Sequence, residues 1–245
     1  MGALAMPVRS SPAKQGLVWI GVALALLLAG LAWPGPARGQ LVLYQQLPDR
    51  NFGLTSDTDY RDDAGHTQAA QTADSFALSS GGSVCGVNWW GFYGGSFVQF
   101  DPPPPGDETM RVRFYENTGG LPGAVLGEHT LVNPTREWTG QFVTGVGSPF
   151  RREYLYRAAL TDCFAAAAGV TYWFEVVQVA DVNSRFRWET SSQGDDDYAL
   201  LFPAGTNWRI SDPLATYDLA FSLITPEPSG LTLALCALLG VVRRR

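Results

Sequence analysis

Lysine, histidine and cysteine are all scarce in this chain of 245 residues. Lys14 is its one lysine, and charged residues make up only 16% of the sequence. Between Gln40 and Thr225 the acidic residues outnumber the arginines two to one. Because an acidic domain of this kind repels phosphate backbones, the composition argues against nucleic acid as a partner.

The motifs of the common catalytic families are missing as well. The sequence contains no GxSxG nucleophile elbow, no Walker loop and no glycine-rich dinucleotide fingerprint. Its two histidines, His66 and His129, stand far apart and outside any HExxH-type metal spacing. Nothing in the sequence nominates a catalytic residue, so we expect a protein that is not an enzyme and needs no cofactor.

One run of carboxylates leaves a metal site open as an alternative. Asp195, Asp196 and Asp197 follow a glycine in a polar stretch near the end of the domain. Adjacent acids on a polar loop are usually just solvated. Carboxylate oxygens also suit Ca²⁺, so a structural calcium ion is the second interpretation of this run.

Residues 1–39 have the organisation of a secretory leader. Two basic residues precede an unbroken apolar run at residues 17–31, which predicts a signal helix, and helix-breaking prolines follow. We expect the secretion translocon to export the chain and signal peptidase to cut after Gly39, leaving Gln40 as the new N-terminus. An uncleaved anchor is the alternative, but the apolar run is short for a membrane span.

The tail, residues 226–245, has three features in order. A Pro-Glu-Pro motif comes first, an apolar stretch at residues 231–242 predicts a short transmembrane helix, and three arginines that favour the cytoplasmic side close the chain. Prolines fix φ and lack an N–H, so we expect the motif to be extended and outside helix and sheet. The motif and the basic cluster are Pro226, Glu227, Pro228, Arg243, Arg244 and Arg245.

This tail resembles the PEP-CTERM sorting signal of Gram-negative bacteria that make exopolysaccharide. The resemblance implies that an exosortase-type membrane enzyme processes the chain and that the product reaches the cell surface or the extracellular matrix. The apolar stretch is shorter than the roughly 20 residues of a comfortable span. It therefore favours a transient anchor in the inner membrane over a permanent one.

Residues 40–225 have the pattern of one all-β domain, an antiparallel, jelly-roll-like β-sandwich. Short runs with alternating apolar residues are separated by turns rich in glycine and proline. Met110, Val112 and Phe114 share one face, for example, whereas Phe164–Ala168 hints at a helix that Gly169 ends at once. The expected strands are residues 41–45, 75–78, 84–93, 96–100, 110–115, 153–160, 171–179, 186–190, 198–202 and 218–224.

The order of aromatic motifs in this domain is similar to that of a β-sandwich domain often found upstream of PEP-CTERM tails. Val87-Asn88-Trp89-Trp90-Gly91 and Ala168-Gly169-Val170-Thr171-Tyr172-Trp173 carry the resemblance. It implies a β-sandwich fold and supplies no enzymatic residues.

Two cysteines belong to the domain, Cys85 and Cys163. Export places them in an oxidising compartment, where they either form a disulfide or remain two buried thiols. Cys85 shares strand parity with Val87 and Trp89, so we expect it to face the core.

Aromatic side chains are the candidates for contact with sugars, because the C–H faces of sugars pack on aromatic rings. Most large aromatics of a sandwich lie in its core. We expect Trp90, Trp188 and Trp208 to be the exposed ones and therefore the candidates for sugar stacking. The aromatic residues weighed for this role are Trp89, Trp90, Tyr93, Trp138, Trp173, Trp188 and Trp208.

Three functions remain open at this point. The first is a non-enzymatic surface or matrix protein associated with exopolysaccharide or biofilm. The second is a carbohydrate-binding adhesin with a specific sugar site. The third is an extracellular polysaccharide hydrolase, which needs two carboxyl groups at a fixed separation across a cleft.

Overall fold

A computed structural model describes residues 40–58, 70–94, 108–144, 151–179, 185–194, 198–201, 207–210 and 217–226. In these residues every regular element is a strand, so none is an apolar helix of membrane-spanning length. The expected signal helix, the apolar helix at 231–242 and the strand at 96–100 lie outside the described residues.

Fourteen strands make up the described part of the chain. They are β1 (Gln40–Gln46), β2 (Pro48–Thr55), β3 (Gln71–Ala77), β4 (Gly82–Tyr93), β5 (Thr109–Thr118), β6 (Leu121–Val132), β7 (Thr135–Val143), β8 (Arg151–Ala166), β9 (Thr171–Gln178), β10 (Phe186–Ser191), β11 (Tyr198–Leu201), β12 (Arg209–Ile210), β13 (Asp218–Leu219) and β14 (Phe221–Pro226).

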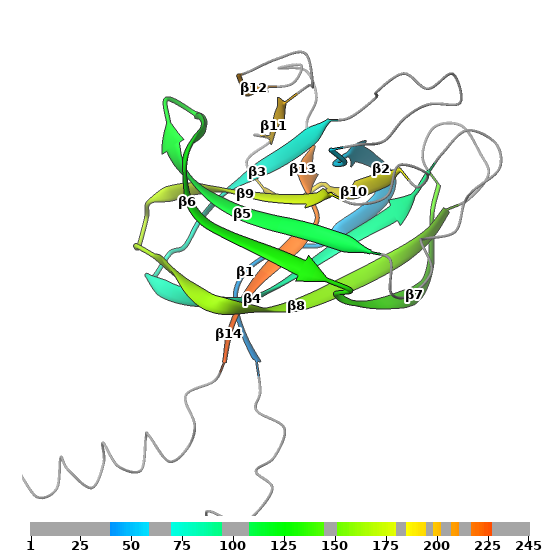
Figure 1. Ribbon diagram of the computed structural model, residues 1–245, viewed down its shortest axis with the longest axis horizontal. Coiled ribbons are helices and arrows are strands. Elements are labelled where there is room, and N and C mark those ends of the chain that lie inside the picture. Colours follow the sequence, from blue (N-terminus) through cyan, green and yellow to red (C-terminus); the bar gives the residue numbers. More distant parts are fainter. Residues whose placement is uncertain are drawn as a thin grey trace, which may run out of the picture. The chain divides into compact units, whose positions relative to one another are not determined.

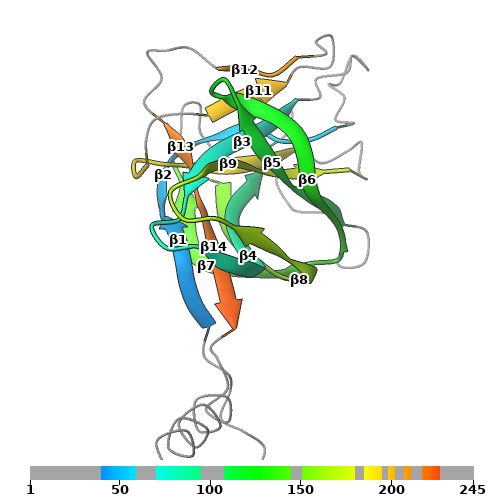
Figure 2. The same ribbon diagram turned by 90° about the vertical axis from the view of Figure 1, so that its left-hand side faces the viewer.

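The strands form two antiparallel sheets. The eight-stranded sheet follows the order β1-β14-β4-β10-β13, with β2 beside β10 and with β8 and β7 extending it from β4. The six-stranded sheet has the order β12-β11-β3-β9-β5-β6. In both views β3, β9, β5 and β6 lie over β14, β4 and β8 (Figures 1 and 2). The expected all-β, antiparallel fold is confirmed.

The two sheets share one core that is rich in aromatic rings. Met110, Val112 and Phe114 of β5 are fully buried in it, as their alternation predicts. Trp89 of β4 stacks on Tyr156 of β8, with ring centroids 5.0 Å apart. Offset and edge-on ring contacts add to the free energy gained by burying apolar area.

The six-stranded sheet is buried on part of its outer face too. Trp173 of β9 packs there with Ala73, Tyr115 and Ala199, and Trp208 lies against this group. Phe174 and Val176 of β9 lie in the shared core, whereas Trp173 lies in this outer cluster, so the apolar residues of β9 are covered on both faces. The two-sided apolar pattern of residues 171–178 is that of a central strand.

Four strands were not predicted from the sequence: β2, β6, β7 and β12. The longer three contain glycines and have many exposed or partly exposed positions, so their apolar alternation is weak. Such strands are stabilised by pairing with a neighbouring strand rather than by an apolar pattern of their own.

The helix expected at Phe164–Ala168 is wrong, because Phe164 to Ala166 are the last residues of β8. Phe164 pairs with Val84 of β4, and its ring stacks on Phe114 with centroids 4.4 Å apart. Burial of this ring outweighs the modest helix propensity of the alanines.

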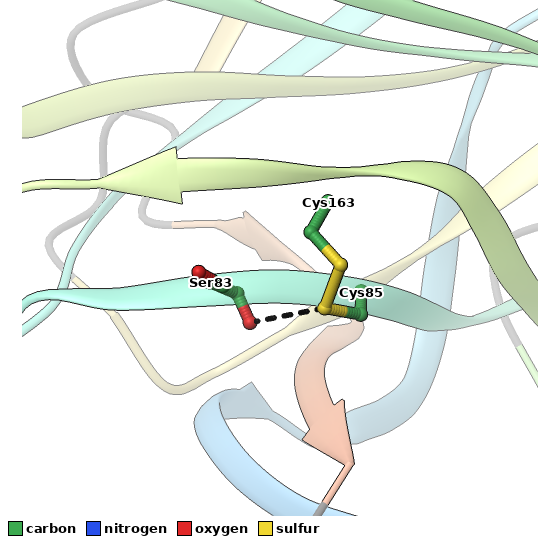
Figure 3. The surroundings of a disulfide bond; sticks show 3 residues. All are labelled: Ser83, Cys85 and Cys163. Carbon is green, nitrogen blue, oxygen red and sulfur yellow. Dashed lines mark hydrogen bonds between the residues drawn. A yellow bond between two sulfur atoms is a disulfide. The ribbon is translucent and has the colours of Figure 1, made fainter.

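Cys85 and Cys163 form a disulfide between β4 and β8, with Cα atoms 4.2 Å apart. Figure 3 shows the bond beside Ser83, whose carbonyl oxygen lies 3.7 Å from the Cys85 sulfur. The expectation that Cys85 faces the core is wrong. A β-bulge between Val84 and Gly86 shifts the alternation, so that Val84 and Val87 both point inward and Cys85 points away.

We predict that removing the disulfide lowers the free energy of unfolding by about 4 kcal/mol, the loop-closure estimate for a bond of this span. The two cysteines are 78 residues apart. Urea unfolding of the protein with and without reductant measures the difference. A double variant, Cys85→Ala with Cys163→Ala, serves as the control because its midpoint should not respond to reductant. Equal midpoints for oxidised and reduced parent protein would contradict the prediction.

Candidate functional site

The first and last strands of the domain lie side by side. β1 pairs with β14, and Gln40 stands opposite Pro226 at the end of the ladder. The free ends of both strands can be followed together in Figure 1. The residue expected to follow leader cleavage and the first residue of the Pro-Glu-Pro motif are therefore neighbours.

Pro226 corrects one expectation, because it belongs to the sheet as the last residue of β14. At an exposed strand end a missing N–H interrupts no interior ladder, so proline is tolerated there. Gly39, Glu227, Pro228 and the arginine cluster 243–245 lie outside the described residues.

Trp188 is not a sugar-stacking residue, because it is fully buried in the core. Its indole Nε1 donates a hydrogen bond to the carbonyl oxygen of Ala220, at 2.9 Å. Phe174 and Phe221 pack edge-on against its ring. A tryptophan whose N–H and ring are both satisfied inside the protein offers no surface to a ligand.

Trp90 is also buried, with only 9% of its surface exposed, although it points away from the core face of β4. The cause is that the eight-stranded sheet curls. Its strands β2, β10, β4, β8 and β7 close into a ring where the Thr144 amide donates to the carbonyl oxygen of Arg50, at 3.0 Å. Neither β2 nor β7 was expected from the sequence, so the covering of Trp90 could not be foreseen.

Trp208 is half-buried and lies edge-on to Tyr115, with ring centroids 5.7 Å apart. It caps the outer cluster of the six-stranded sheet rather than standing free. Asp195, Asp196 and Asp197 lie outside the described residues. Within the part of the chain that is described, no three His, Cys, Asp or Glu side chains come together as a metal site.

Two fully buried carboxyl groups face each other inside the ring of strands, Glu153 of β8 and Glu189 of β10. The Glu153 carboxylate accepts a hydrogen bond from Arg50 Nε at 3.0 Å. Burial, and then the negative charge of Glu153, raises the pKa of Glu189 to about 9. Glu189 is therefore neutral at pH 7, and the Arg50–Glu153 ion pair is the charged partner beside it.

Another buried acid, Glu108, joins the two sheets at the start of β5. The hydroxyls of Tyr93 and Tyr156 donate to it, and Arg136 Nη1 lies 2.8 Å from its other oxygen. Burial raises the pKa of Glu108, while the hydrogen bonds and Arg136 act in the opposite direction. These four residues join β4, β5, β7 and β8, so the cluster serves the fold rather than a ligand.

A groove of about 530 Å³ opens between β6 and β8, beside the disulfide. His129, Glu128 and Asp162 supply polar groups to its walls, and Tyr172 closes one side. Glu128 forms an ion pair with Arg113. The groove holds acids and an imidazole near one another.

Among the described residues, the clearest exposed aromatic surface lies on β7 and the adjoining start of β8. We call it the aromatic shelf and define it as Trp138, Phe142 and Arg152. Trp138 is 50% exposed and Phe142 45%, and their ring centroids are 6.1 Å apart at an angle of 66°. The Arg152 guanidinium lies over the Trp138 ring, 5.7 Å from its centroid.

A β-bulge builds the shelf. Trp138 pairs with Tyr154, and the next pairing is Phe142 with Arg152, so three residues of β7 stand against one residue of β8 between the two rings. Gly140 has a φ of +81° there, which favours glycine. Trp138 was among the aromatics weighed from the sequence but was not selected. A glycine between two aromatics in a strand is the signal that could have marked the bulge.

We predict that the free energy of unfolding falls as the pH rises from about 4.5 to about 9, because folded Glu189 keeps a proton that the unfolded chain releases in this range. Glu189→Gln keeps the shape but cannot ionise. It should flatten the decline and raise the Tm at the alkaline end. Thermal melts across this pH range provide the measurement, with Glu137→Gln as the surface control. Parallel pH profiles for parent and Glu189→Gln would show that Glu189 does not titrate as described.

A comparison with curated proteins finds no match. A family described as a domain of unknown function (DUF7901) matches residues 42–224, which include nearly all of the strands from β1 to β14. Because the match covers well over half of the chain, the protein belongs to the DUF7901 family.

Proposed function

We propose that this is an exported, non-enzymatic surface or matrix protein of a Gram-negative bacterium, sorted by a PEP-CTERM tail and associated with exopolysaccharide. In this proposal a signal peptidase removes residues 1–39, and an exosortase-type enzyme processes the tail at the inner membrane. The domain left outside is a jelly-roll-like β-sandwich.

The pairing of Gln40 with Pro226 is the observation that best supports the proposal. The folded strands begin and end where the leader and the tail are expected to join the domain. Both junctions lie at one end of one antiparallel ladder, so one face of the domain can stand against the membrane during both cleavages. The other face then remains free for contacts outside the cell.

The disulfide is a second point of support. Disulfides persist in the periplasm and outside the cell and are rare in the reducing cytosol. The Cys85–Cys163 bond joins two central strands of the larger sheet. It is a stabilising device suited to an exported domain.

A polysaccharide hydrolase has less support among the described residues than a surface protein. Glu189, whose pKa is raised, and the neighbouring Glu153 are both fully buried. A glycosidase needs its two carboxyl groups on either side of a cleft that admits the sugar. The aromatic shelf, by contrast, favours sugar binding without cleavage as a second candidate function.

Mass spectrometry of both termini tests the sorting proposal. The full chain is expressed in a host that carries an exosortase, and surface protein is compared with protein from the same host without the enzyme. We expect Gln40 at the N-terminus in both hosts. Loss of Arg243–Arg245 should occur only in the host that carries the exosortase. Surface-exposed protein that still ends at Arg245 would rule the proposal out.

A further inference from the structure

Trp138 and Phe142 stand out because most large aromatic side chains of the described residues are buried. Tyr217, the other aromatic among the exposed large side chains, does not form part of this pair. Two adjacent half-exposed rings cost free energy in water, since each leaves apolar area unburied. A ligand that covers both rings recovers that free energy, so we take the pair as the candidate contact surface.

The Trp138 ring and the bulge beside it are held in place before any ligand arrives. Trp138 Nε1 donates a hydrogen bond to the carbonyl oxygen of Gln141, at 3.3 Å. The backbone N–H of Gln141 donates to Thr139 Oγ1 at 3.2 Å, and the Thr139 hydroxyl donates to the backbone carbonyl oxygen of Glu153 at 3.4 Å. Binding of a ligand therefore costs little side-chain entropy, because the shelf is already ordered.

The size of the shelf argues against a protein partner. Two rings that are half exposed present on the order of 200 Å² of contact area. A stable protein–protein interface needs about 800 Å² on each side. The shelf is large enough for one or two sugar rings and too small to hold a folded partner by itself.

The open shape of the shelf argues against an enclosed small molecule. Pockets for such ligands surround most of the ligand surface. The groove between β6 and β8 is lined by residues other than those of the shelf. A shelf on a strand contacts one side of a ligand and leaves it free to continue in both directions, as a polymer does.

The chemistry of the shelf matches the two sides of a sugar ring. Trp138 and Phe142 meet at 66°, so they form an apolar corner for C–H groups. Thr139 and Gln141 lie between the two rings in the bulge and supply polar groups beside them. Arg152 adds a positive charge at the Trp138 ring in a domain that is acidic as a whole.

We propose that the aromatic shelf binds a polysaccharide chain whose pyranose rings lie against Trp138 and Phe142. The proposal deepens the proposed function and rests on it, because it names the residues through which the surface protein contacts polysaccharide. Neutral and uronate-bearing chains share the C–H face that the shelf recognises. Arg152 favours the uronate-bearing chain.

Affinity electrophoresis of the mature protein in gels containing polysaccharide tests the shelf. The gels contain a neutral β-glucan, a uronate-rich polymer, or no polymer. We expect the parent to be retarded, Trp138→Ala to bind roughly 10-fold or more weakly, and Trp138→Phe to fall between them. Tyr217→Ala, which removes an exposed aromatic outside the shelf, should bind like the parent. Retardation by the uronate-rich polymer alone would locate the preference in Arg152, and Arg152→Gln should then weaken that binding.

Two results would overturn the proposal: a parent protein that no polysaccharide retards, and a Trp138→Ala protein that is retarded like the parent. Thermal melts of each variant guard against misfolding, because a half-exposed ring at position 138 contributes little to stability. The sorting proposal is judged separately by the masses of the termini. Correct processing without sugar binding removes the shelf proposal and leaves the sorting proposal standing.

Discussion

The antiparallel pairing of β4 with β8 is the contact on which the rest of the structure depends. It runs from Gly82 opposite Ala166 to Gly91 opposite Tyr154. The Trp89–Tyr156 stack lies on its core side, and the disulfide crosses it where both strands are irregular. The opposite edge of β4 carries β14 and then β10, while β8 carries β7, so the larger sheet is assembled around this pair.

The β4–β8 pair also determines the positions of the two ends of the domain and of the aromatic shelf. β14 pairs with β4, and β1 pairs with the other edge of β14, which sets Gln40 beside Pro226. On the other side, β7 pairs with β8 in regular register up to Trp138, and the bulge that exposes the shelf follows. The junctions with leader and tail and the shelf are thus attached to one central ladder through different strands.

Alternation identified the strands that fill the core, such as β5 with Met110 and Phe114, because these strands carry their own apolar pattern. The closing of the ring of strands by β2 and β7 could not be predicted, since it depends on contacts such as Arg50 with Glu153 that join distant parts of the chain. Trp90 was misjudged for that reason. Cys85 was misjudged because a single bulge reverses every parity argument beyond it.

The central claim is that the folded domain holds its first and last residues together, where leader and tail are expected to join it. Cysteines placed at Leu41 and Thr225, which pair across β1 and β14, test it most directly. In mature protein isolated from an exporting host, we predict that they form a disulfide that non-reducing peptide mapping detects, alongside Cys85–Cys163. A free thiol at both positions in the folded, processed protein would contradict the account.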